Sequence, residues 1–360
     1  MPKILFICIH RPDRSPSQRF RFEQYLDYLK QNGFDHKISF LLNEKDDKIF
    51  YSPGKYLSKT RIVLQSIIKR LGEVIHPNAD IIFVQREAIM IGTSFFERMF
   101  SKRRKLIYDF DDSLWIKQVS PANEAISFLK NSGKIKRIIN TADLVIAGNK
   151  FLASYAASFN KNIVVIPTTI DTTIHKPSVK NASEKVCIGW TGSFSTIEHF
   201  KLALPFLCKI KDKYKERIWF KVIGDSGYKN KDLGIKEIQW NRQNEIEQLQ
   251  EIDIGIMPLP QDDWARGKCG FKGIQYMSLG IPAIMTNVGV NKEIIEDGVN
   301  GFLAESDDEW IDKLSILIEN KDRRKDMGNK GITTITEKYS VIANRELYLN
   351  CFLSLIDTAG

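Results

Sequence analysis

The sequence predicts an α/β protein built from two doubly wound domains that face a cleft. Short apolar, β-rich runs alternate with longer helical patterns along the 360 residues, which is typical of parallel sheets with crossover helices. The alternation stops once, at residues 166–184, where prolines, a polar stretch and a change in net charge coincide. A chain of this length also suits two hydrophobic cores better than one.

The first domain is predicted over residues 1–172, with a strand at each short apolar run. These runs are Lys3–Ile9, Ile38–Leu42, Asp80–Gln85, Lys105–Phe110, Leu144–Ala147 and Asn162–Ile166. Gln18–Asn32 and Glu124–Asn140 have the periodicity of amphipathic helices. A last helix is expected over about 341–360; its apolar residues need a partner, and the first domain is one candidate.

The second domain is predicted over residues 183–340, where the alternation begins again. Its predicted strands are Lys185–Trp190, Trp219–Ile223, Ile235–Trp240, Ile252–Met257 and Ile281–Thr286. Its predicted helices are Ile197–Tyr214, Gln243–Glu251, Phe271–Leu279 and Glu309–Asn320. Doubly wound domains bind ligands at the carboxyl ends of their strands, so a substrate cleft between the two domains is expected.

Composition and charge exclude several classes of protein. No run approaches the roughly 18 uncharged apolar residues of a membrane span, and no signal-peptide cleavage site is present. The five cysteines form no CxxC pair, so neither a zinc site nor a disulfide framework is expected. This use of cysteine is typical of a reducing environment, so a cytoplasmic location is expected. Residues 1–180 hold 29 Lys and Arg against 17 Asp and Glu, whereas residues 181–360 hold 24 against 27. This excess suits an anionic membrane or a phosphate-bearing substrate; no nucleic-acid-binding motif accompanies it.

The segment Asp263–Pro282 is the densest candidate site. It follows a predicted strand and contains Gly270 where a helix begins, so it offers unpaired backbone N–H groups to an anion. Arg266, Lys268 and Lys272 add three cations close to that helix start. This combination suits a diphosphate.

Two further features complete the predicted donor site. Gln275, one turn into the same helix, is placed to hydrogen-bond a ribose hydroxyl. Gly192 and Ser193 lie in a glycine turn after the first strand of the second domain, where their N–H groups would approach the same diphosphate. The turn alone is weak evidence, since many α/β proteins have one for chain reversal.

These residues resemble glycosyltransferase family 4. The resemblance is carried by Ile188-Gly-Trp-Thr-Gly-Ser193, Val222-Ile-Gly-Asp225, Arg266-Gly-Lys-Cys-Gly-Phe-Lys272, Gln275-Tyr-Met-Ser-Leu-Gly-Ile-Pro282, Val288-Gly-Val-Asn-Lys-Glu293 and Asp297-Gly-Val-Asn-Gly-Phe-Leu303. It covers the whole second domain, and the linker Ile166-Pro-Thr-Thr-Ile-Asp171 is similar to the family's Ile-Pro-Asn-Gly-Val-Asp signature. The resemblance implies a GT-B fold and metal-independent transfer from a nucleotide sugar with retention of anomeric configuration.

The sequence departs from that family's commonest donor motif, two glutamates eight positions apart. Gln275 stands in the place of the second glutamate and Gly267 in the place of the first. The chain resembles a subgroup with Gly-Lys-Cys-x-Phe-Lys and Gln-Tyr-Met-Ala instead. Backbone N–H groups around Cys269–Phe271 are the candidates to contact the donor sugar in place of the first glutamate.

The candidate catalytic residues lie in the first domain. The resemblance places the family's catalytic-cleft residue, often a histidine, where this chain has Asp109, Asp111 and Asp112. An ionised aspartate at the anomeric carbon would stabilise an oxocarbenium-like transition state or accept the acceptor's proton. Asp109-Phe-Asp111 also spells the DxD motif of metal-dependent, single-domain glycosyltransferases. The two-domain layout and the second phosphate site make a metal redundant, so neither a metal nor a cofactor is expected beside the nucleotide-sugar substrate.

Basic residues of the first domain predict two further contacts. Arg19 and Arg21 follow the first strand and suit the phosphate or carboxylate of an acceptor; a surface pair at a helix start is the alternative. His10, at the end of the first strand, faces the predicted cleft. An anionic membrane that carries the acceptor is the second predicted contact, which implies peripheral attachment to the inner face of a membrane. Its predicted residues are Lys102-Arg-Arg-Lys105, Lys130, Lys134, Lys136 and Arg137.

The leading hypothesis is a glycosyltransferase that moves a hexosyl group from a UDP- or GDP-sugar to a saccharide or lipid-linked acceptor in surface polysaccharide or glycolipid synthesis. A sugar-nucleotide epimerase or hydrolase of the same fold is the alternative, and only that alternative would turn over without an acceptor. A nucleic-acid-binding protein would explain the basic first half but not the phosphate loop of the second, so no nucleic-acid partner is expected. A dehydrogenase is disfavoured because no GxGxxG motif opens either domain.

Overall fold

The computed structural model describes residues 1–116, 131, 133–178, 185–193, 196–224 and 227–356. Parts of four predictions lie outside the described residues: the helix Glu124–Asn140, the membrane contact at Lys130, the linker and the motif that ends at Asp225. The chain divides into two compact units. Unit 1 comprises Met1–Thr168 with Asn344–Gly360, and unit 2 comprises Thr169–Ala343. The division falls inside the predicted linker.

Unit 1 contains a sheet of six parallel strands in the order β2-β1-β3-β4-β5-β6. The strands are β1 (Lys3–Ile7), β2 (Asp35–Ser39), β3 (Ile81–Gln85), β4 (Lys105–Phe110), β5 (Leu144–Ala147) and β6 (Ile163–Val165). β3 and β4 are buried along nearly their whole length, as expected for continuous apolar runs in a parallel sheet. The predicted strand Ile38–Leu42 lies three residues too late, because the pairing with β1 starts at Asp35, opposite Lys3.

The helices of unit 1 depart from the prediction in two places. They are α1 (Pro16–Arg19), α2 (Leu26–Gln31), α3 (Glu44–Phe50), α4 (Tyr56–Ile75), α5 (Phe95–Ser101), α6 (Gly133–Thr141), α7 (Lys150–Ala157) and α16 (Val341–Ile356). The predicted helix Gln18–Asn32 is divided, since Phe22 leaves the helical conformation (φ −135°) and stacks on Phe6, with ring centroids 4.9 Å apart. The longest helix of the unit, α4, is absent from the prediction, because much of its buried face is polar. None of the described helices is both long and apolar enough to cross a membrane.

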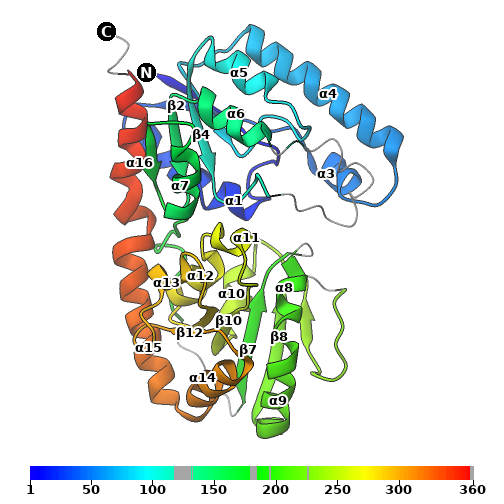
Figure 1. The fold of residues 1–360 in the computed structure, drawn as a ribbon, viewed down its shortest axis with the longest axis vertical. Coiled ribbons are helices and arrows are strands. Elements are labelled where there is room, and N and C mark those ends of the chain that lie inside the picture. Colours follow the sequence, from blue (N-terminus) through cyan, green and yellow to red (C-terminus); the bar gives the residue numbers. More distant parts are fainter. Residues whose placement is uncertain (117–130, 132, 179–184, 194–195, 225–226, 357–360) are drawn as a thin grey trace. The chain divides into compact units, whose positions relative to one another are not determined.

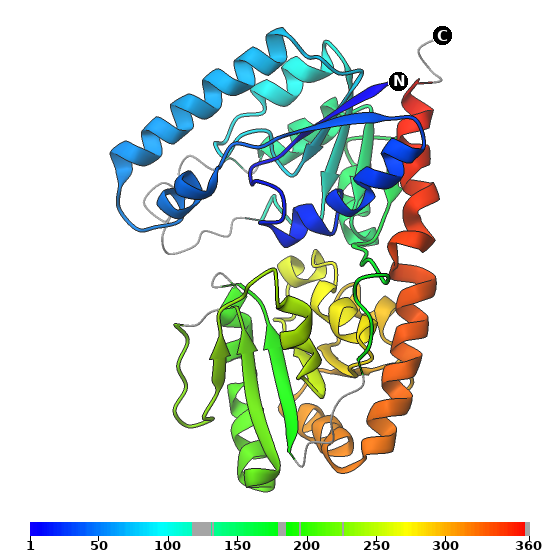
Figure 2. The ribbon, with the colours of Figure 1, turned by 180° about the vertical axis from the view of Figure 1, so that it is seen from behind.

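The C-terminal helix α16 runs alongside the other elements of unit 1 (Figure 2) and packs aromatic side chains into its core. Tyr348 stacks on Tyr25 with ring centroids 4.2 Å apart, and Phe352 contacts the rings of Phe6 and Phe83 from the sheet. Both helix residues are fully buried. This aromatic contact attaches the C-terminal end of the chain to the core of the first unit.

Unit 2 contains a second sheet of six parallel strands, in the order β12-β11-β10-β7-β8-β9. The strands are β7 (Val186–Thr191), β8 (Ile218–Ile223), β9 (Lys236–Ile238), β10 (Ile254–Met257), β11 (Ala283–Thr286) and β12 (Phe302–Ala304). Two doubly wound α/β units, each with a parallel sheet, confirm the predicted fold class. The short edge strand β12 is absent from the prediction, since three residues carry too little pattern.

The helices of unit 2 flank this sheet (Figure 1). They are α8 (Ile197–Lys201), α9 (Leu204–Tyr214), α10 (Glu245–Gln250), α11 (Asp263–Arg266), α12 (Phe271–Ser278), α13 (Asn291–Ile294), α14 (Asp307–Glu319) and α15 (Lys321–Thr334), which a π-helical turn at Ile335–Tyr339 follows. The predicted helix Ile197–Tyr214 is divided before Pro205, because proline has no N–H to donate and fits only the first turn of a helix. Phe206 and Trp310 stack where α9 meets α14, with ring centroids 4.7 Å apart.

Replacing Phe352 by alanine is expected to lower the free energy of unfolding by about 3–5 kcal/mol, because the buried ring would leave a cavity among aromatic neighbours. Leu353, the next residue in α16 but 38% exposed, is the matched control, and Leu353→Ala is expected to cost less than about 1 kcal/mol. Chemical denaturation followed by circular dichroism measures both losses. Equal losses would contradict the packing described for α16.

Candidate functional site

The winding direction of the second sheet changes at β7. This strand comes first in unit 2 and pairs with β8 on one side and with β10 on the other. Open α/β sheets bind ligands beyond the carboxyl ends of the strands at such a switch point. β7 ends at Thr191 and β10 at Met257, and the two segments predicted to bind the donor follow these two strands. The topology therefore brings both segments to one crevice.

The glycine turn after β7 is tightly constrained. A Cβ atom at Gly224, where φ is +131°, would lie 1.6 Å from the carbonyl oxygen of Gly192, so no other residue fits there. The N–H of Gly192 donates to the carbonyl of Ile223 (2.9 Å), and the N–H of Ser193 donates to Oγ1 of Thr196 (3.0 Å). The first of these bonds joins the turn to the end of β8, and the second lies within the turn. The predicted contact of Gly192 and Ser193 with a diphosphate stays a prediction.

The helix α12 begins at Phe271, directly after a glycine in the left-handed conformation. Gly270 has φ +66° and supplies no side-chain cap to the helix. A Cβ atom at this position would lie 2.2 Å from Cδ1 of Ile294, so both space and conformation require glycine. No side chain at position 270 covers the partial positive charge at the start of the helix. The predicted anion site requires an uncapped helix start of this kind.

Two of the three predicted cations contact side chains of α11: Arg266 is the last residue of that helix, and Lys268 follows it by two residues. Nη1 of Arg266 lies 3.0 Å from Oδ1 of Asp263, and both side chains are more than half exposed. Nζ of Lys268 lies 3.6 Å from the centroid of the Trp264 ring. An exposed cation–π contact is worth only about 0.5–1 kcal/mol, and a hydrogen bond to a phosphate is stronger. Such a lysine can exchange its ring contact for a phosphate.

Aromatic rings connect this segment to β7 and α8. Nζ of Lys272, in the first turn of α12, lies 5.5 Å from the centroid of Trp190, which is at the end of β7. The imidazole of His199 on α8 stacks on Trp264 with ring centroids 4.7 Å apart. Trp190 and His199 are residues that the sequence did not identify, because nothing in their spacing ties them to a segment more than sixty residues away.

Gln275 lies deeper than a surface ribose contact would suggest. Its side chain is buried, and Nε2 donates to Oε1 of Glu245 on α10 at 3.0 Å. Sequence analysis did not identify Glu245, although its carboxylate is buried beside Gln275. The family motif contains two glutamates eight positions apart, whereas Glu245 lies 30 residues before Gln275 in the chain. The pair holds the amide of Gln275 in one orientation, so its other polar atom is the one that can meet a ligand.

Tyr276 fixes α12 against β7. Its hydroxyl accepts a hydrogen bond from the N–H of Thr191 at 2.9 Å. Gly255 on β10 leaves the room for the ring, since a Cβ atom there would lie 2.3 Å from it. Burial raises the pKa of Tyr276, so the hydroxyl stays protonated at neutral pH. The start of α12 is thereby positioned at the switch point.

In unit 1, Arg21 and Asp109 form a buried ion pair. Nη2 and Nε of Arg21 donate to the carboxylate at 2.5 and 3.2 Å, and Nη1 donates to the carbonyl of Ile166 at 2.5 Å. The two side chains are 1% and 0% exposed. Burial raises the pKa of Asp109, and the charge of Arg21 opposes that rise. Asp109 and Arg21 are therefore structural partners here, which corrects their assignment to catalysis and to acceptor binding.

Arg19 is also buried, so the alternative of a surface pair is wrong for both arginines. Its guanidinium lies 4.7 Å from the ring centroid of Phe20. The position next to the fold's core gives Arg19 a packing role in the structure, and its predicted contact with an acceptor stays a prediction.

The other two predicted aspartates flank Arg86 just beyond β4. Nε of Arg86 donates to Asp111 at 2.7 Å, and Nη2 donates to Asp112 at 3.4 Å. Burial lowers the pKa of Arg86, but the charges of the two aspartates outweigh it and raise the pKa above its ordinary value. Arg86 has φ +61°, a conformation that costs a non-glycine residue of order 1 kcal/mol and is frequent at functional sites. Asp109 and Asp111 thus contact different arginines. The described residues contain no cluster of His, Cys, Asp and Glu that could hold a metal ion.

A second polar cluster surrounds His10, beyond the carboxyl end of β1. Nδ1 of His10 lies 3.4 Å from Asp47, and Nε2 lies 3.3 Å from the hydroxyl of Tyr51. Arg14 donates to Asp47 at 2.6 Å. Burial raises the pKa of Asp47, but His10 and Arg14 outweigh burial and lower the pKa to about 2. The β1 end is the switch point of the first sheet, so this cluster occupies the ligand-binding edge of unit 1.

A comparison with protein families covers the two segments that are predicted to bind the donor. Residues 185–320 match the family described as glycosyl transferases group 1. This match spans β7, β10, α11 and α12, so it includes both segments at the switch point of unit 2. It confirms the prediction that the chain is a glycosyltransferase. No curated protein matches the chain by sequence.

Solved structures with the same architecture cover nearly the whole chain. The sucrose-phosphate synthase of Thermosynechococcus elongatus is 11% identical, with a TM-score of 0.76 over 99% of this chain and 100% of the other. HepE of Anabaena in complex with UDP and glucose is 14% identical, with a TM-score of 0.69 and the same coverage. The lipopolysaccharide outer core galactosyltransferase WaaB is 14% identical, with a TM-score of 0.61 over 99% of this chain and 100% of the other. At these identities the likeness concerns the fold, and it confirms the predicted GT-B architecture.

The Asp47 cluster predicts a pH dependence of stability. Asp47 stays charged to a lower pH in the folded chain than in the unfolded chain, so its contribution is present above about pH 3.8 and is lost as the pH falls to about 2. Asp47→Asn is expected to remove this part of the pH dependence. Thermal unfolding across that range measures it, with Asp27→Asn on the exposed side of α2 as the control for loss of one charge. A wild-type slope in the Asp47 variant would contradict the assignment.

Proposed function

We propose that the chain transfers a hexosyl group from a UDP- or GDP-sugar to a saccharide or lipid-linked acceptor, with retention of anomeric configuration and without a metal. The observation that carries the proposal is the concentration of Arg266, Lys268 and Lys272 around the start of α12, at the switch point of the unit that matches group 1 glycosyl transferases. Synthesis of a surface polysaccharide or glycolipid is the proposed context.

The donor diphosphate is the ligand that this group of cations suits best. In the transfer reaction, the bond between the anomeric carbon and the terminal phosphate oxygen breaks, and negative charge develops on the leaving nucleoside diphosphate. Donors and cations already aimed at that charge stabilise the transition state more than the ground state. Three cations and a helix start supply the charge that Mg²⁺ supplies in metal-dependent enzymes, which supports the metal-independent form of the proposal.

Two of the proposed donor-binding cations, Lys268 and Lys272, contact aromatic rings in this structure. Nζ of Lys268 and Nζ of Lys272 lie 3.6 and 5.5 Å from the ring centroids of Trp264 and Trp190. A hydrogen bond to a phosphate is stronger than such a ring contact, so the two ammonium groups are proposed to turn toward the donor diphosphate when it binds. Gln275, oriented by Glu245, is proposed to contact the ribose, and the backbone from Gly270 to Phe271 the sugar.

On the acceptor side, Asp111 and Asp112 are the proposed catalytic residues. Both follow β4 and pair with Arg86, whereas the third predicted carboxylate, Asp109, is buried in an ion pair with Arg21. Arg86 donates a hydrogen bond to each of them, and an ionised carboxylate can stabilise positive charge at the anomeric carbon or take a proton from the acceptor hydroxyl. Their pairing with one arginine also makes them a single unit, so replacing either is expected to disturb the other.

UDP-glucose is the donor to test first, because the structure of HepE contains UDP and glucose in the same architecture. Purified protein is incubated with UDP- and GDP-sugars, with and without saccharide and lipid-linked acceptors, and release of the nucleotide is followed. Acceptor-dependent release supports transfer. Equal release without an acceptor would instead support the epimerase or hydrolase alternative, and no release under any pairing would overturn the proposal.

Lys272→Ala is expected to lower kcat/KM for the donor by about 100-fold, because it removes one cation from the charge that develops on the leaving diphosphate. Lys325→Ala, on the exposed side of α15, is the matched control and is expected to keep wild-type kinetics. Steady-state rates across donor concentrations measure both variants. Wild-type values for Lys272→Ala would show that the donor binds elsewhere.

Asp111→Asn is expected to lower kcat by about 100-fold or more while KM for the donor changes little, because the carboxylate acts on the reacting atoms and not on the nucleotide. Asp297→Asn, an exposed aspartate of unit 2, controls for the loss of one charge. A variant that raises KM for the donor and keeps kcat would assign Asp111 to binding instead.

A further inference from the structure

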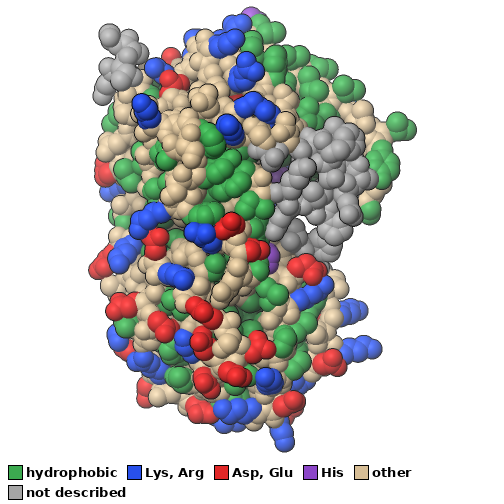
Figure 3. Space-filling view, in the orientation of Figure 1, with side chains coloured by type: hydrophobic (Ala, Val, Ile, Leu, Met, Phe, Trp, Pro, Cys, Tyr) green, Lys and Arg blue, Asp and Glu red, His purple; other side chains and the backbone are tan. Residues whose placement is uncertain are grey.

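The exposed face of α4 carries a continuous apolar stripe. Five large aliphatic residues succeed one another at spacings of seven, four, three and four positions, and all of them are exposed. They are Leu57 (90%), Leu64 (55%), Ile68 (69%), Leu71 (38%) and Ile75 (54%). At 3.6 residues per turn these positions fall on one side of the helix, over a length of roughly 27 Å. Figure 3 shows hydrophobic side chains along α4.

The opposite face of α4 is buried but largely polar, which fixes the orientation of the helix. Lys59, Ser66 and Arg70 lie on this face. The guanidinium of Arg70 is fully buried and donates to the carbonyls of Cys8 (2.8 Å) and Ala88 (2.7 Å). It also donates to Oγ of Ser39 and to Glu73. Turning the helix to bury its aliphatic residues would break these bonds, so the stripe stays outward.

Such a stripe is unusual on a monomeric surface. Single exposed aliphatic residues are ordinary, but a contiguous apolar patch marks a surface that another body covers. The charge of α4 narrows the choice of partner. Arg61 and Lys69 are exposed on the helix, and its one acidic residue, Glu73, is occupied by Arg70.

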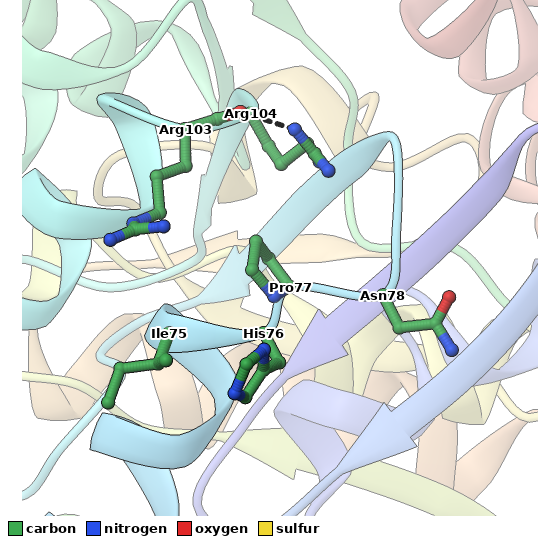
Figure 4. A pocket seen from close by; sticks show the side chains of 6 residues that line it. All are labelled: Ile75, His76, Pro77, Asn78, Arg103 and Arg104. Atoms are coloured by element: carbon green, nitrogen blue, oxygen red, sulfur yellow. Dashed lines mark hydrogen bonds between the residues drawn. The ribbon is translucent and has the colours of Figure 1, made fainter.

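A basic pocket continues the stripe at its C-terminal end. Ile75, the last member of the stripe, lines this pocket of about 520 Å³ together with His76, Pro77, Asn78, Arg103 and Arg104 (Figure 4). Nε of Arg104 donates to the carbonyl of Ala79 at 2.6 Å, which holds its guanidinium in place. The pocket precedes β3 and β4, so it lies at the amino ends of the strands and not at the edge where Asp111 is found. It is therefore separate from the proposed catalytic residues.

We propose that α4 and this basic pocket form the surface by which the protein docks on an anionic membrane. The aliphatic stripe lies in the interface between headgroups and acyl chains, and His76, Arg103 and Arg104 meet the lipid phosphates. A helix with one apolar side and flanking cations binds membranes in this orientation, through buried apolar area and attraction to anionic lipid together. The cations beside the stripe favour an anionic lipid surface as the occupant over a second, equally basic copy of this chain.

This surface differs from the contact that the sequence predicts. Lys134 of that prediction is buried, and its ammonium donates to Glu87 and to the carbonyls of Ile89 and Ile91. Nζ of Lys136 lies 5.0 Å from the ring centroid of Phe159. Only the segment around Arg103 belongs to both surfaces. Burial excludes Lys134 from the predicted contact, whereas Lys136 and Arg137 are exposed.

The test is co-sedimentation of the full chain with vesicles of phosphatidylcholine alone and of phosphatidylcholine mixed equally with phosphatidylglycerol. Wild-type protein is expected to bind the mixed vesicles, and binding is expected to weaken as salt shortens the Debye length. The double variant Leu64→Gln, Ile68→Gln is expected to lose at least about tenfold in partitioning, and Arg103→Gln about fivefold. The double variant Leu202→Gln, Ile316→Gln, with side chains 46% and 44% exposed in unit 2, is the matched control and keeps wild-type binding.

Three outcomes would overturn the proposal: no binding to mixed vesicles at low salt, equal binding to vesicles without anionic lipid, or wild-type binding by the stripe variant. Sedimentation velocity adds a fourth. A wild-type dimer that becomes a monomer on replacement of Leu64 and Ile68 would assign the stripe to self-association. Circular dichroism shows that each variant is folded, as the exposure of these residues leads us to expect. Vesicle binding is measured without donor or acceptor, so its failure leaves the proposed transfer reaction unaffected.

Discussion

Within each unit the described strands all run parallel, and this constraint decides where the rest of the structure lies. Parallel strands need helical crossovers, so helices cover the sheet and the strands become buried apolar runs. The same constraint collects all carboxyl ends of a sheet at one edge. The donor segments after Thr191 and Met257 lie at that edge in unit 2, and Asp111 lies at the corresponding edge in unit 1. The basic pocket at His76 lies at the opposite edge, so topology separates the proposed chemistry from the proposed membrane contact.

The charged residues fall into two groups, which differ in burial and in the role they have in the molecule. Arg21, Asp109 and Arg70 are enclosed, and their hydrogen bonds join helices and loops to the strands. Removing one partner of such a pair leaves a buried charge without compensation, at a cost of about 3–5 kcal/mol. Lys268 and Lys272, by contrast, touch aromatic rings in contacts worth about 0.5–1 kcal/mol. The first group maintains the fold, and the second group is proposed to contact the donor diphosphate.

Much of the fold was predictable because a buried parallel strand reads as an apolar run whatever surrounds it. The departures occur where one tertiary contact outweighs a local pattern. Phe22 interrupts a periodic helix in order to stack on Phe6, and α4 escapes the prediction because its polar side, including Arg70, faces inward. Pro205 is a departure of another kind, since the sequence itself contains the reason for the division of that helix.

The sequence by itself determined the two doubly wound domains, the linker region between them and the segment Asp263–Pro282 with its cations and glycines, because each of these is encoded in neighbouring residues. Only the tertiary structure decided which polar groups are accessible. It enclosed Asp109 with Arg21, bonded the N–H of Gly192 to the carbonyl of Ile223 and set Glu245 against Gln275. These contacts join residues far apart in the chain. Burial and pairing depend on the fold as a whole, so no local spacing could reveal them.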